Sequence, residues 1–215
     1  GKGNNGGASG GAGGGFISLN IAGTFTHDGV VSTDGINGGI QDQEGGGGGA
    51  GGGIYIITNE LQGTGSFRAN GGYGGNHNRD GGGGGGGIIA IHYNTGGLSD
   101  PSSSQVNGGS GQNNGASGSV GTLAFIHHTD GVSSNYDNAS LYVYHGWQWD
   151  ASNEGTYLSF EAYNGTKVSG PDIDDYSFTF SNYYNLLDNA IWTIPLENTT
   201  LTTNNLTLST GSEID

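Results

Sequence analysis

The chain of 215 residues contains no cysteine and no methionine, and it has only three prolines. Without cysteine, neither a disulfide framework nor a thiolate metal site is possible. No apolar run reaches the roughly 18 residues that a membrane-spanning helix needs, so no such span is expected. The absence of an initiator methionine predicts a processed product or a segment of a longer protein.

Basic residues are also scarce, because four Lys and Arg stand against 19 Asp and Glu and give a formal net charge of −15. Such a balance excludes nucleic acid and an anionic membrane surface as partners. Asn, Thr, Ser, Gly and Tyr take the place of the usual charged surface residues. This composition is typical of secreted or cell-surface β proteins, so we expect an extracellular or cell-surface location.

Glycine is the residue in excess, with 49 copies, most of them before residue 122. Each ordered glycine costs roughly 0.5–1 kcal/mol relative to alanine, so an ordered segment of this kind needs compensation. Four glycine-rich runs each lead into an apolar strand, and these strands are predicted to begin at Phe16, Ile54, Ile88 and Leu123. A second short element follows in GVVSTDG, GSFRANGG and SSQVNGG. A pattern kept over four copies predicts a stacked array rather than flexible linkers.

The four apolar strands, FISL, IYII, IIAI and LAFI, are apolar on both faces. A strand of this kind is typical of a parallel sheet that is covered on both sides. The long connections between equivalent strands also favour parallel pairing over hairpins. Because glycine has no Cβ, we expect the glycine segments to form strands that approach a neighbouring backbone closely. The sequence therefore predicts an all-β protein with a glycine-rich parallel β-solenoid over residues 1–130.

Residues 131–215 show ordinary strands in which apolar and polar residues alternate, as in TYLSFEAYNG, YSFTFS, NAIWTIPL and NLTLST. Period-two alternation indicates one buried face and one face in water. This β-rich C-terminal region is either a continuation of the solenoid or a small β-sandwich.

Residues 6–130 resemble the glycine-rich solenoid regions of large secreted bacterial and archaeal surface proteins, which are adhesin-like. The resemblance is carried by G-G-x-G-G-[I/F]-x-[I/L], by the following x-G-x-[V/F]-x-[A/T]-[N/D]-G-G, and by the closing copy GSVGTLAFI. It implies a right-handed parallel β-helix with an extracellular structural or adhesive role, and it brings no catalytic residues.

Candidate sites lie mainly in the C-terminal region. Four N-x-[ST] sequons predict glycosylation at Asn138, Asn164, Asn198 and Asn205. An acidic loop with Asp172, Asp174 and Asp175 is a candidate Ca²⁺ site, with a solvated loop as the alternative. A second group of carboxylates, Asp34, Asp42 and Glu44, has the same two interpretations.

Two further interpretations concern aromatic rings. Tyr142, Tyr144, Trp147 and Trp149 either stack on sugar rings or form the core of a strand. His92 and His127 occupy the same position in their repeats, which predicts a stacked polar pair or a two-histidine metal site, with His128 pointing the other way.

No G-x-S-x-G, H-E-x-x-H or phosphate-loop motif is present, and no cofactor other than Ca²⁺ is suggested. We therefore expect a non-enzymatic protein that is a structural subunit of an extracellular filament, with its own copies as partners in head-to-tail contacts. The alternative is an adhesin segment that binds carbohydrate. A β-helix polysaccharide hydrolase or lyase that uses Asp172 and Asp175 comes third.

Overall fold

We describe a computed structural model of the chain that places residues 7–41, 43–77, 81–131, 136, 138–149, 156–170, 177–193 and 199–215. Within these ranges the chain forms β-strands, one short 3-10 helix, η1 (Pro101–Ser103), and no α-helix. The prediction of a β protein is confirmed.

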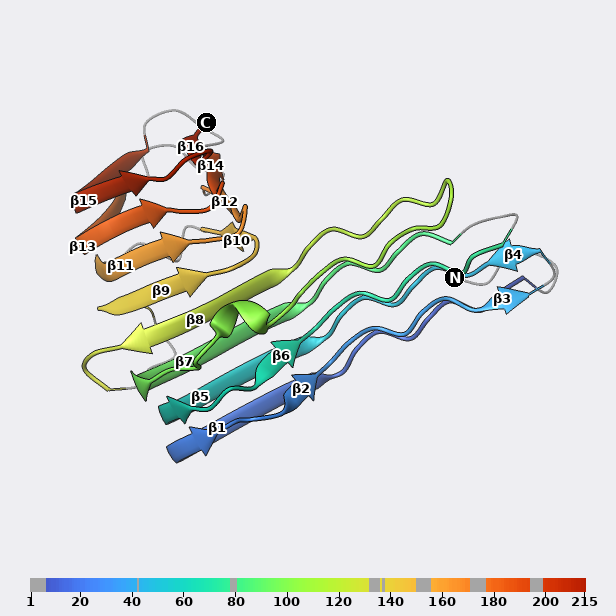
Figure 1. Cartoon of the computed structure of the whole chain (residues 1–215), viewed down its shortest axis with the longest axis horizontal. Helices are drawn as coiled ribbons and strands as arrows, with labels where there is room; N and C mark the ends of the chain where they lie inside the picture. Colours follow the sequence, from blue (N-terminus) through green and yellow to red (C-terminus); the bar gives the residue numbers. More distant parts are fainter. Residues whose placement is uncertain are drawn as a thin grey trace.

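The largest element is an eight-stranded sheet with the order β1-β5-β7-β8-β9-β11-β13-β15 (Figure 1). Every neighbouring pair is parallel except β8 and β9, which are antiparallel, so the strand direction reverses once in the middle of the sheet. The predicted parallel pairing is therefore confirmed in both halves. The strands are β1 (Phe16–Thr26), β5 (Gly53–Gln62), β7 (Ile88–Gly96), β8 (Thr122–His128), β9 (Ala139–Val143), β11 (Thr156–Ala162), β13 (Ser177–Leu186) and β15 (Thr200–Leu208).

Smaller sheets accompany the large one. A parallel four-stranded sheet has the order β10-β12-β14-β16, and β2 and β6 form a parallel pair. The parallel pairing of β9 to β16 differs from the antiparallel sheets of a β-sandwich. A short antiparallel pair, β3 and β4, lies at the far end of the first glycine segments. The bounds are β2 (Val30–Ser32), β3 (Ile40–Gln41), β4 (Glu44–Gly45), β6 (Ser66–Arg68), β10 (Trp147–Gln148), β12 (Lys167–Ser169), β14 (Ile191–Thr193) and β16 (Glu213–Ile214).

The register of the first long strands differs from the sequence prediction at two places. β5 begins at Gly53 and β8 at Thr122, one residue before the apolar positions from which the prediction counts. A shift of one residue turns every side chain to the other face of the sheet, so this difference decides which side chains meet. The column across the four strands that faces the core runs through Ile17, Ile54, Ile89 and Leu123, of which Ile17 is partly buried and the other three are buried.

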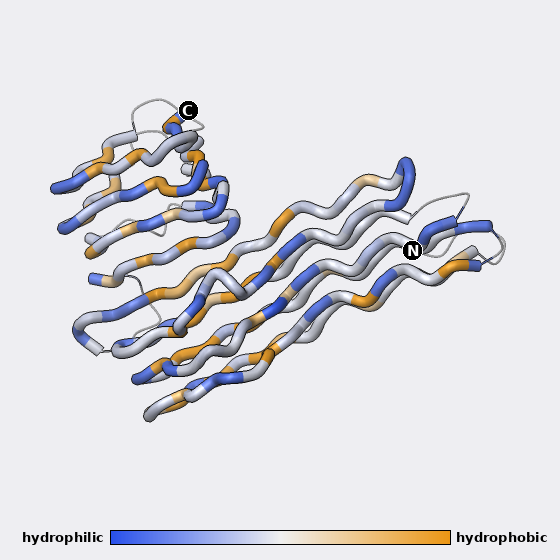
Figure 2. The backbone as a smooth tube through the Cα atoms, in the orientation of Figure 1, coloured by the Kyte–Doolittle hydropathy of each residue, from blue (hydrophilic) through white to orange (hydrophobic). Residues whose placement is uncertain are grey.

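The hydrophobic core changes from one face of the sheet to the other at β8. Leu123 and Phe125 belong to a core shared with β5, β6 and β7, whereas Ala124 and Ile126 of the same strand belong to a second core with β9 to β14. β8 is therefore apolar on both faces because it closes both cores. Figure 2 shows the hydrophobic residues along the strands and intermediate hydropathy along the glycine segments.

Seven glycine-rich segments extend beyond the strands as a long arm (Figure 1), which we call the glycine arm. They are not strands, contrary to the prediction, because their backbone hydrogen bonds recur every third residue. Gly46, Gly49 and Gly52 donate to one neighbouring segment, while Gly48 and Gly51 donate to another, at N···O distances of 2.8–2.9 Å. A three-residue period is that of a polyproline-II helix. The segments are 8–15, 33–39, 46–53, 69–75, 81–87, 106–111 and 115–121.

The arm has two layers, since hydrogen bonds join the segments in a zigzag. Segments 8–15, 46–53, 81–87 and 115–121 form the first layer, and the other three segments form the second. A Cβ added to Gly84 would lie 2.0 Å from the carbonyl oxygen of Gly49, and one added to Gly49 would lie 2.0 Å from that of Ala12. Real Cβ atoms do not approach an oxygen so closely. The expectation that glycine permits a close approach of two backbones is confirmed.

Every third residue of the arm points away from the opposite layer. A Cβ added to Gly13, Gly47 or Gly85 meets no atom closer than 3.6 Å. We call the outer surface of the first layer the glycine face; its residues are Gly13, Gly47, Ala50, Gly82, Gly85, Ala116 and Ser119. The outer surface of the second layer carries side chains, and we call it the asparagine face; its residues are Asp34, Asn37, Asn70, Tyr73, Asn107 and Ser110.

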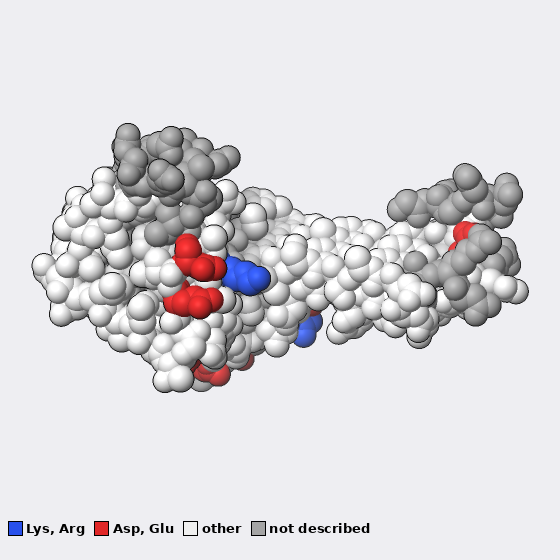
Figure 3. Space-filling view, turned by 90° about the horizontal axis from the view of Figure 1, so that it is seen from above, with Lys and Arg blue, Asp and Glu red and all other residues white. Residues whose placement is uncertain are grey.

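Charged residues are absent from most of the arm. Figure 3 shows them over the strand region and near the tip of the arm, with uncharged surface between. The four segments of the first layer contain no Asp, Glu, Lys or Arg. The glycine face is therefore an uncharged surface of backbone.

The two kinds of glycine position predict opposite responses to alanine. In Gly84→Ala the new methyl group would overlap a backbone carbonyl, so we expect a loss of about 3 kcal/mol or more in the free energy of unfolding. In Gly85→Ala it would point outward, so we expect a change within about 1 kcal/mol. Chemical denaturation of the two single variants measures both values, and equal losses would contradict the layered arrangement.

Candidate functional site: the outer strands and the predicted binding residues

The two outermost strands of the large sheet, β1 and β15, have no strand on their outer sides in the part of the chain that the structure describes. An edge strand presents a row of backbone N–H and C=O groups that can pair with another chain. Natural proteins usually protect such edges by making them short or charged. Here β1 has 11 residues, β15 has 9, and neither contains a charged residue.

Both edges also expose the ends of the hydrophobic cores. Leu206 and Leu208 of β15 pair with the buried Tyr184 and Leu186, yet they are 49 % and 46 % exposed. In β1, Leu19 pairs with the fully buried Ile56 and is itself only partly buried. The buried columns therefore continue to the last strand at each edge, where nothing among the described residues covers them.

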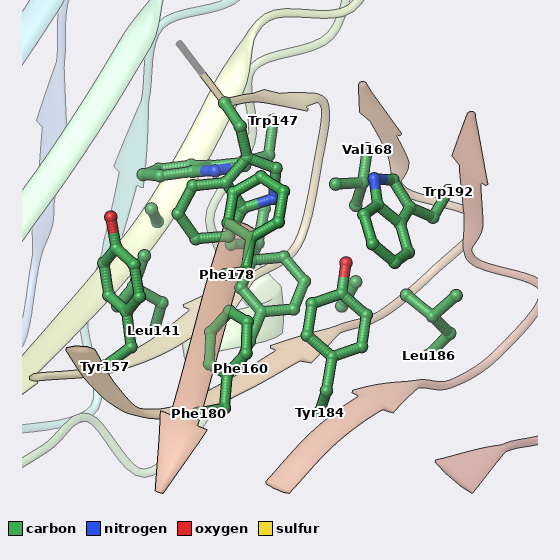
Figure 4. Close-up of a cluster of buried hydrophobic side chains, with 14 of the residues drawn as sticks. Leu141, Trp147, Tyr157, Phe160, Val168, Phe178, Phe180, Tyr184, Leu186 and Trp192 are labelled. Carbon is green, nitrogen blue, oxygen red and sulfur yellow. The ribbon is translucent and has the colours of Figure 1, made fainter. Parts of the chain in front are cut away.

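The two predicted sugar-binding tryptophans are core residues. Trp149 is fully buried and Trp147 is 8 % exposed. Trp147 lies in the cluster of aromatic and aliphatic side chains from β9 to β14 that Figure 4 shows, with Phe160, Phe178 and Trp192. Trp149 packs against this cluster, with its ring centroid 4.9 Å from that of Phe178. A sugar ring could stack on either indole only if the core opened.

The two predicted tyrosines lie elsewhere, on the opposite face of β9 and just beyond its end. Tyr142 and Tyr144 are half-buried and line a pocket of about 260 Å³ together with Tyr93 and Tyr163. Tyr144 stacks on Tyr163 with ring centroids 4.9 Å apart. Sugar binding by these two tyrosines stays a prediction. The remaining lining residues are Gly96, Gly97, Leu98, Pro101 and Phe125.

Three of the four sequon asparagines are placed by the structure. Asn138 and Asn164 are exposed in turns with φ of 53° and 54°, and Asn205 is exposed in β15. Asn198 lies outside the described residues. Exposure meets one requirement for a glycosylation acceptor, and glycosylation stays a prediction.

The predicted calcium ligands Asp172, Asp174 and Asp175 lie outside the described residues, as does Asp42. Asp34 forms an ion pair with Arg68, with an Nη2–Oδ2 distance of 2.8 Å, and its Oδ1 accepts the backbone N–H of Asn70. Among the residues that the structure places, no three His, Cys, Asp or Glu side chains lie close enough to share a metal ion.

The histidine pair differs from the prediction because of the register of β8. His92 lies beside His128, with Nδ1 and Nε2 3.0 Å apart and the rings stacked, whereas His127 pairs with Tyr93. His92 and His128 are buried. Burial lowers the pKa of His128, and the neighbouring His127 lowers it further. The pair is a polar contact between β7 and β8 in the interior of the protein.

The asparagine face shows a pattern that sequence reasoning missed. Asp34 and Asn70 accept the backbone N–H of Asn70 and Asn107 through their side-chain oxygens, and Asn37 accepts that of Tyr73, at 2.7–2.8 Å. The signal is present in the sequence as triplets in which every third residue carries a side chain, as in NGGYGGN over residues 70–76.

Comparisons with protein-family models, curated proteins and solved structures each found no match. In the ranges that the structure describes, no helix is long and apolar enough to cross a membrane.

The tyrosine pocket predicts an alkaline loss of stability. Burial, Glu161, Tyr142 and Asp100 raise the pKa of Tyr144 to about 12, from an ordinary value near 10. Between these two pH values the folded state keeps a proton that the unfolded state releases, so stability falls as the pH rises through this window. We expect the free energy of unfolding to fall between pH 9 and about pH 11.5, and to fall less in Tyr144→Phe. Urea unfolding at both pH values measures this, and an unchanged slope in the variant would contradict it.

Proposed function

We propose that this protein is a non-enzymatic structural subunit of an extracellular filament or surface fibre, in which copies join through the outer strands of the sheet. The observation that carries the proposal is the pair of long, uncharged edge strands, β1 and β15, with half-exposed core residues at both edges. One edge completes the other, so the contact is heterologous. Contacts of this kind produce filaments when the rotation between copies does not close.

The arrangement of side chains favours a parallel pair between β15 of one copy and β1 of the next. In this arrangement Leu206 and Leu208 continue the column that contains Leu19 of the next copy, so both exposed core ends are covered. β1 and β15 of one copy run in opposite directions, because the β8–β9 pair is antiparallel. Successive copies are then related by a half-turn, and their glycine arms extend from alternate sides of the filament.

The chain itself is, in this proposal, a parallel β-solenoid with two stacks, since six long strands, β1, β5, β9, β11, β13 and β15, are each followed along the chain by a short strand of a smaller sheet. A solenoid grows by adding coils to an open edge, and terminal coils with polar outer faces normally stop this growth. Neither edge described here has such a coil. Self-assembly and solenoid architecture therefore support each other.

Charged side chains at one edge should prevent filaments. In the double variant Leu206→Glu, Leu208→Glu, charges replace the apolar end of the core, and we expect small particles in place of long fibres under negative-stain electron microscopy. The matched control is Ser177→Glu, Ser181→Glu, because both serines are exposed on β13, one strand away from the edge. If the edge variant forms fibres as readily as the unsubstituted chain, the proposal is contradicted.

A second candidate function is carbohydrate binding, and the tyrosine pocket between η1 and β9 favours it. Tyr142, Tyr144 and Tyr163 offer aromatic faces in a hollow of the size of one sugar ring. If this function is correct, Tyr144→Ala abolishes glycan binding on an array while Tyr73→Ala, an exposed tyrosine of the arm, leaves it unchanged. A chain that binds no glycan and forms fibres leaves only the structural role.

A further inference from the structure

We infer that the glycine face of the arm is a docking surface for the glycine face of a second copy, so that subunits pair side by side as well as end to end. This lateral contact is separate from the strand edges of the proposed function. The residues of this face are Gly13, Gly47, Ala50, Gly82, Gly85, Ala116 and Ser119.

The two faces of the arm differ in whether side chains accept hydrogen bonds from their outward backbone N–H groups. On the asparagine face, side-chain oxygens of Asp34, Asn37 and Asn70 accept these N–H groups. On the glycine face Ser119 carries the only polar side chain. Among the described residues, the N–H groups of Gly47, Ala50, Gly82 and Gly85 have no acceptor within the protein. Three outward N–H groups of the asparagine face, those of Asn70, Tyr73 and Asn107, are thus satisfied by side chains of the same face, whereas the glycine face keeps a regular array of donors with a three-residue period.

Inside the arm, backbone N–H groups with the same three-residue spacing are satisfied by carbonyl oxygens of the opposite layer. Gly46, Gly49 and Gly52 of the first layer donate to carbonyl oxygens of the second layer, each at 2.8 Å. Neighbouring segments in different layers run antiparallel. A second copy turned by a two-fold axis presents its own glycine face in the same antiparallel sense and with the same three-residue spacing. The acceptors are the carbonyl oxygens of Gly48, Gly51 and Gly83, to which no backbone N–H donates among the described residues. The proposed contact repeats a packing that the molecule already uses.

Two physical features favour a second copy as the occupant. The first layer carries no charged residue, so two such faces do not repel each other in spite of the overall charge of −15. Glycine and alanine also have no side-chain rotamers to lose, so ordering this surface costs less entropy than ordering an ordinary interface. Both features apply to both partners, as an isologous contact requires.

The base of the glycine face adds apolar surface to the same contact. Phe16 and Ile88 follow Gly13 and Gly85 by three residues, so they continue the outward rows of the arm, and they are 72 % and 60 % exposed. Gly53 lies between them in the sheet register, which leaves a hollow of about 450 Å³. Pairing of two copies would cover these side chains.

The test uses the full-length chain with the edge substitutions Leu206→Glu and Leu208→Glu, so that end-to-end growth is blocked. We expect sedimentation velocity to give twice the chain mass of 21.7 kDa at micromolar concentrations. Adding Gly47→Glu and Gly85→Glu should return the protein to a monomer, because these positions have room for a side chain but then carry charge into the contact. The matched control adds Tyr73→Glu and Ser110→Glu on the asparagine face and should stay a dimer.

A monomer in the edge-blocked background would overturn the lateral contact, as would a dimer that resists the charged glycine face. Circular dichroism shows whether each variant is folded. Hydrogen exchange adds an independent readout, because the amides of Ala50 and Gly82 should exchange more slowly at concentrations where the dimer forms. These outcomes are distinct from failure of the proposed filament, in which the edge substitutions would leave end-to-end assembly unchanged.

Discussion

The close approach of backbone to backbone in the glycine arm is the constraint on which the rest of the molecule depends. Where the Cβ of Gly84 or Gly49 would stand, a carbonyl oxygen of the neighbouring segment stands instead. In the segments that have a neighbour on both sides, 46–53, 70–75 and 81–87, the inner positions hold only glycine, and a side chain occurs only at the outer position of a triplet, as at Ala50, Asn70 and Tyr73. Among the described residues of the arm, only Ala69 and Val106 at its base belong to a hydrophobic core, so the stability of the rest comes from backbone hydrogen bonds between segments that are held in register. The strand region, with its two cores, supplies that register.

The strand region joins two stacks of strands whose hydrophobic cores lie on opposite faces of one sheet. β8 does this with Leu123 and Phe125 on one face and Ala124 and Ile126 on the other. Because both the strand direction and the buried face reverse at β8 and β9, the sheet continues without an internal edge. Among the described strands of this large sheet, the open edges are β1 and β15, where apolar columns end partly exposed.

Sequence reasoning predicts the β class and the parallel pairing from apolar columns and long connections, and both are confirmed. It misplaces β5 and β8 by one residue, because Gly53 and Thr122 begin these strands without an apolar signal. That slip assigns His127 rather than His128 as the neighbour of His92. The three-residue period of the arm is visible in NGGYGGN, but long runs of glycine hide it elsewhere. Burial of Trp147 and Trp149 could not be decided from alternation, which core strands and exposed aromatic strands share.

The asymmetry of the arm connects these features to assembly. A two-layer arrangement of glycine segments has two outer surfaces with equivalent backbone geometry, yet only one has asparagine and aspartate side chains that accept its N–H groups. Gly47 and Gly85 have room for a side chain, so asparagine could stand at these positions as it does on the asparagine face. If both surfaces faced only water, the two faces would be expected to carry the same kind of triplet. Packing within the subunit therefore does not explain why the glycine face carries so few side chains, with Ala50, Ala116 and Ser119 as its only residues other than glycine. Contact with another flat backbone surface supplies one, because each added side chain would hold the two surfaces apart.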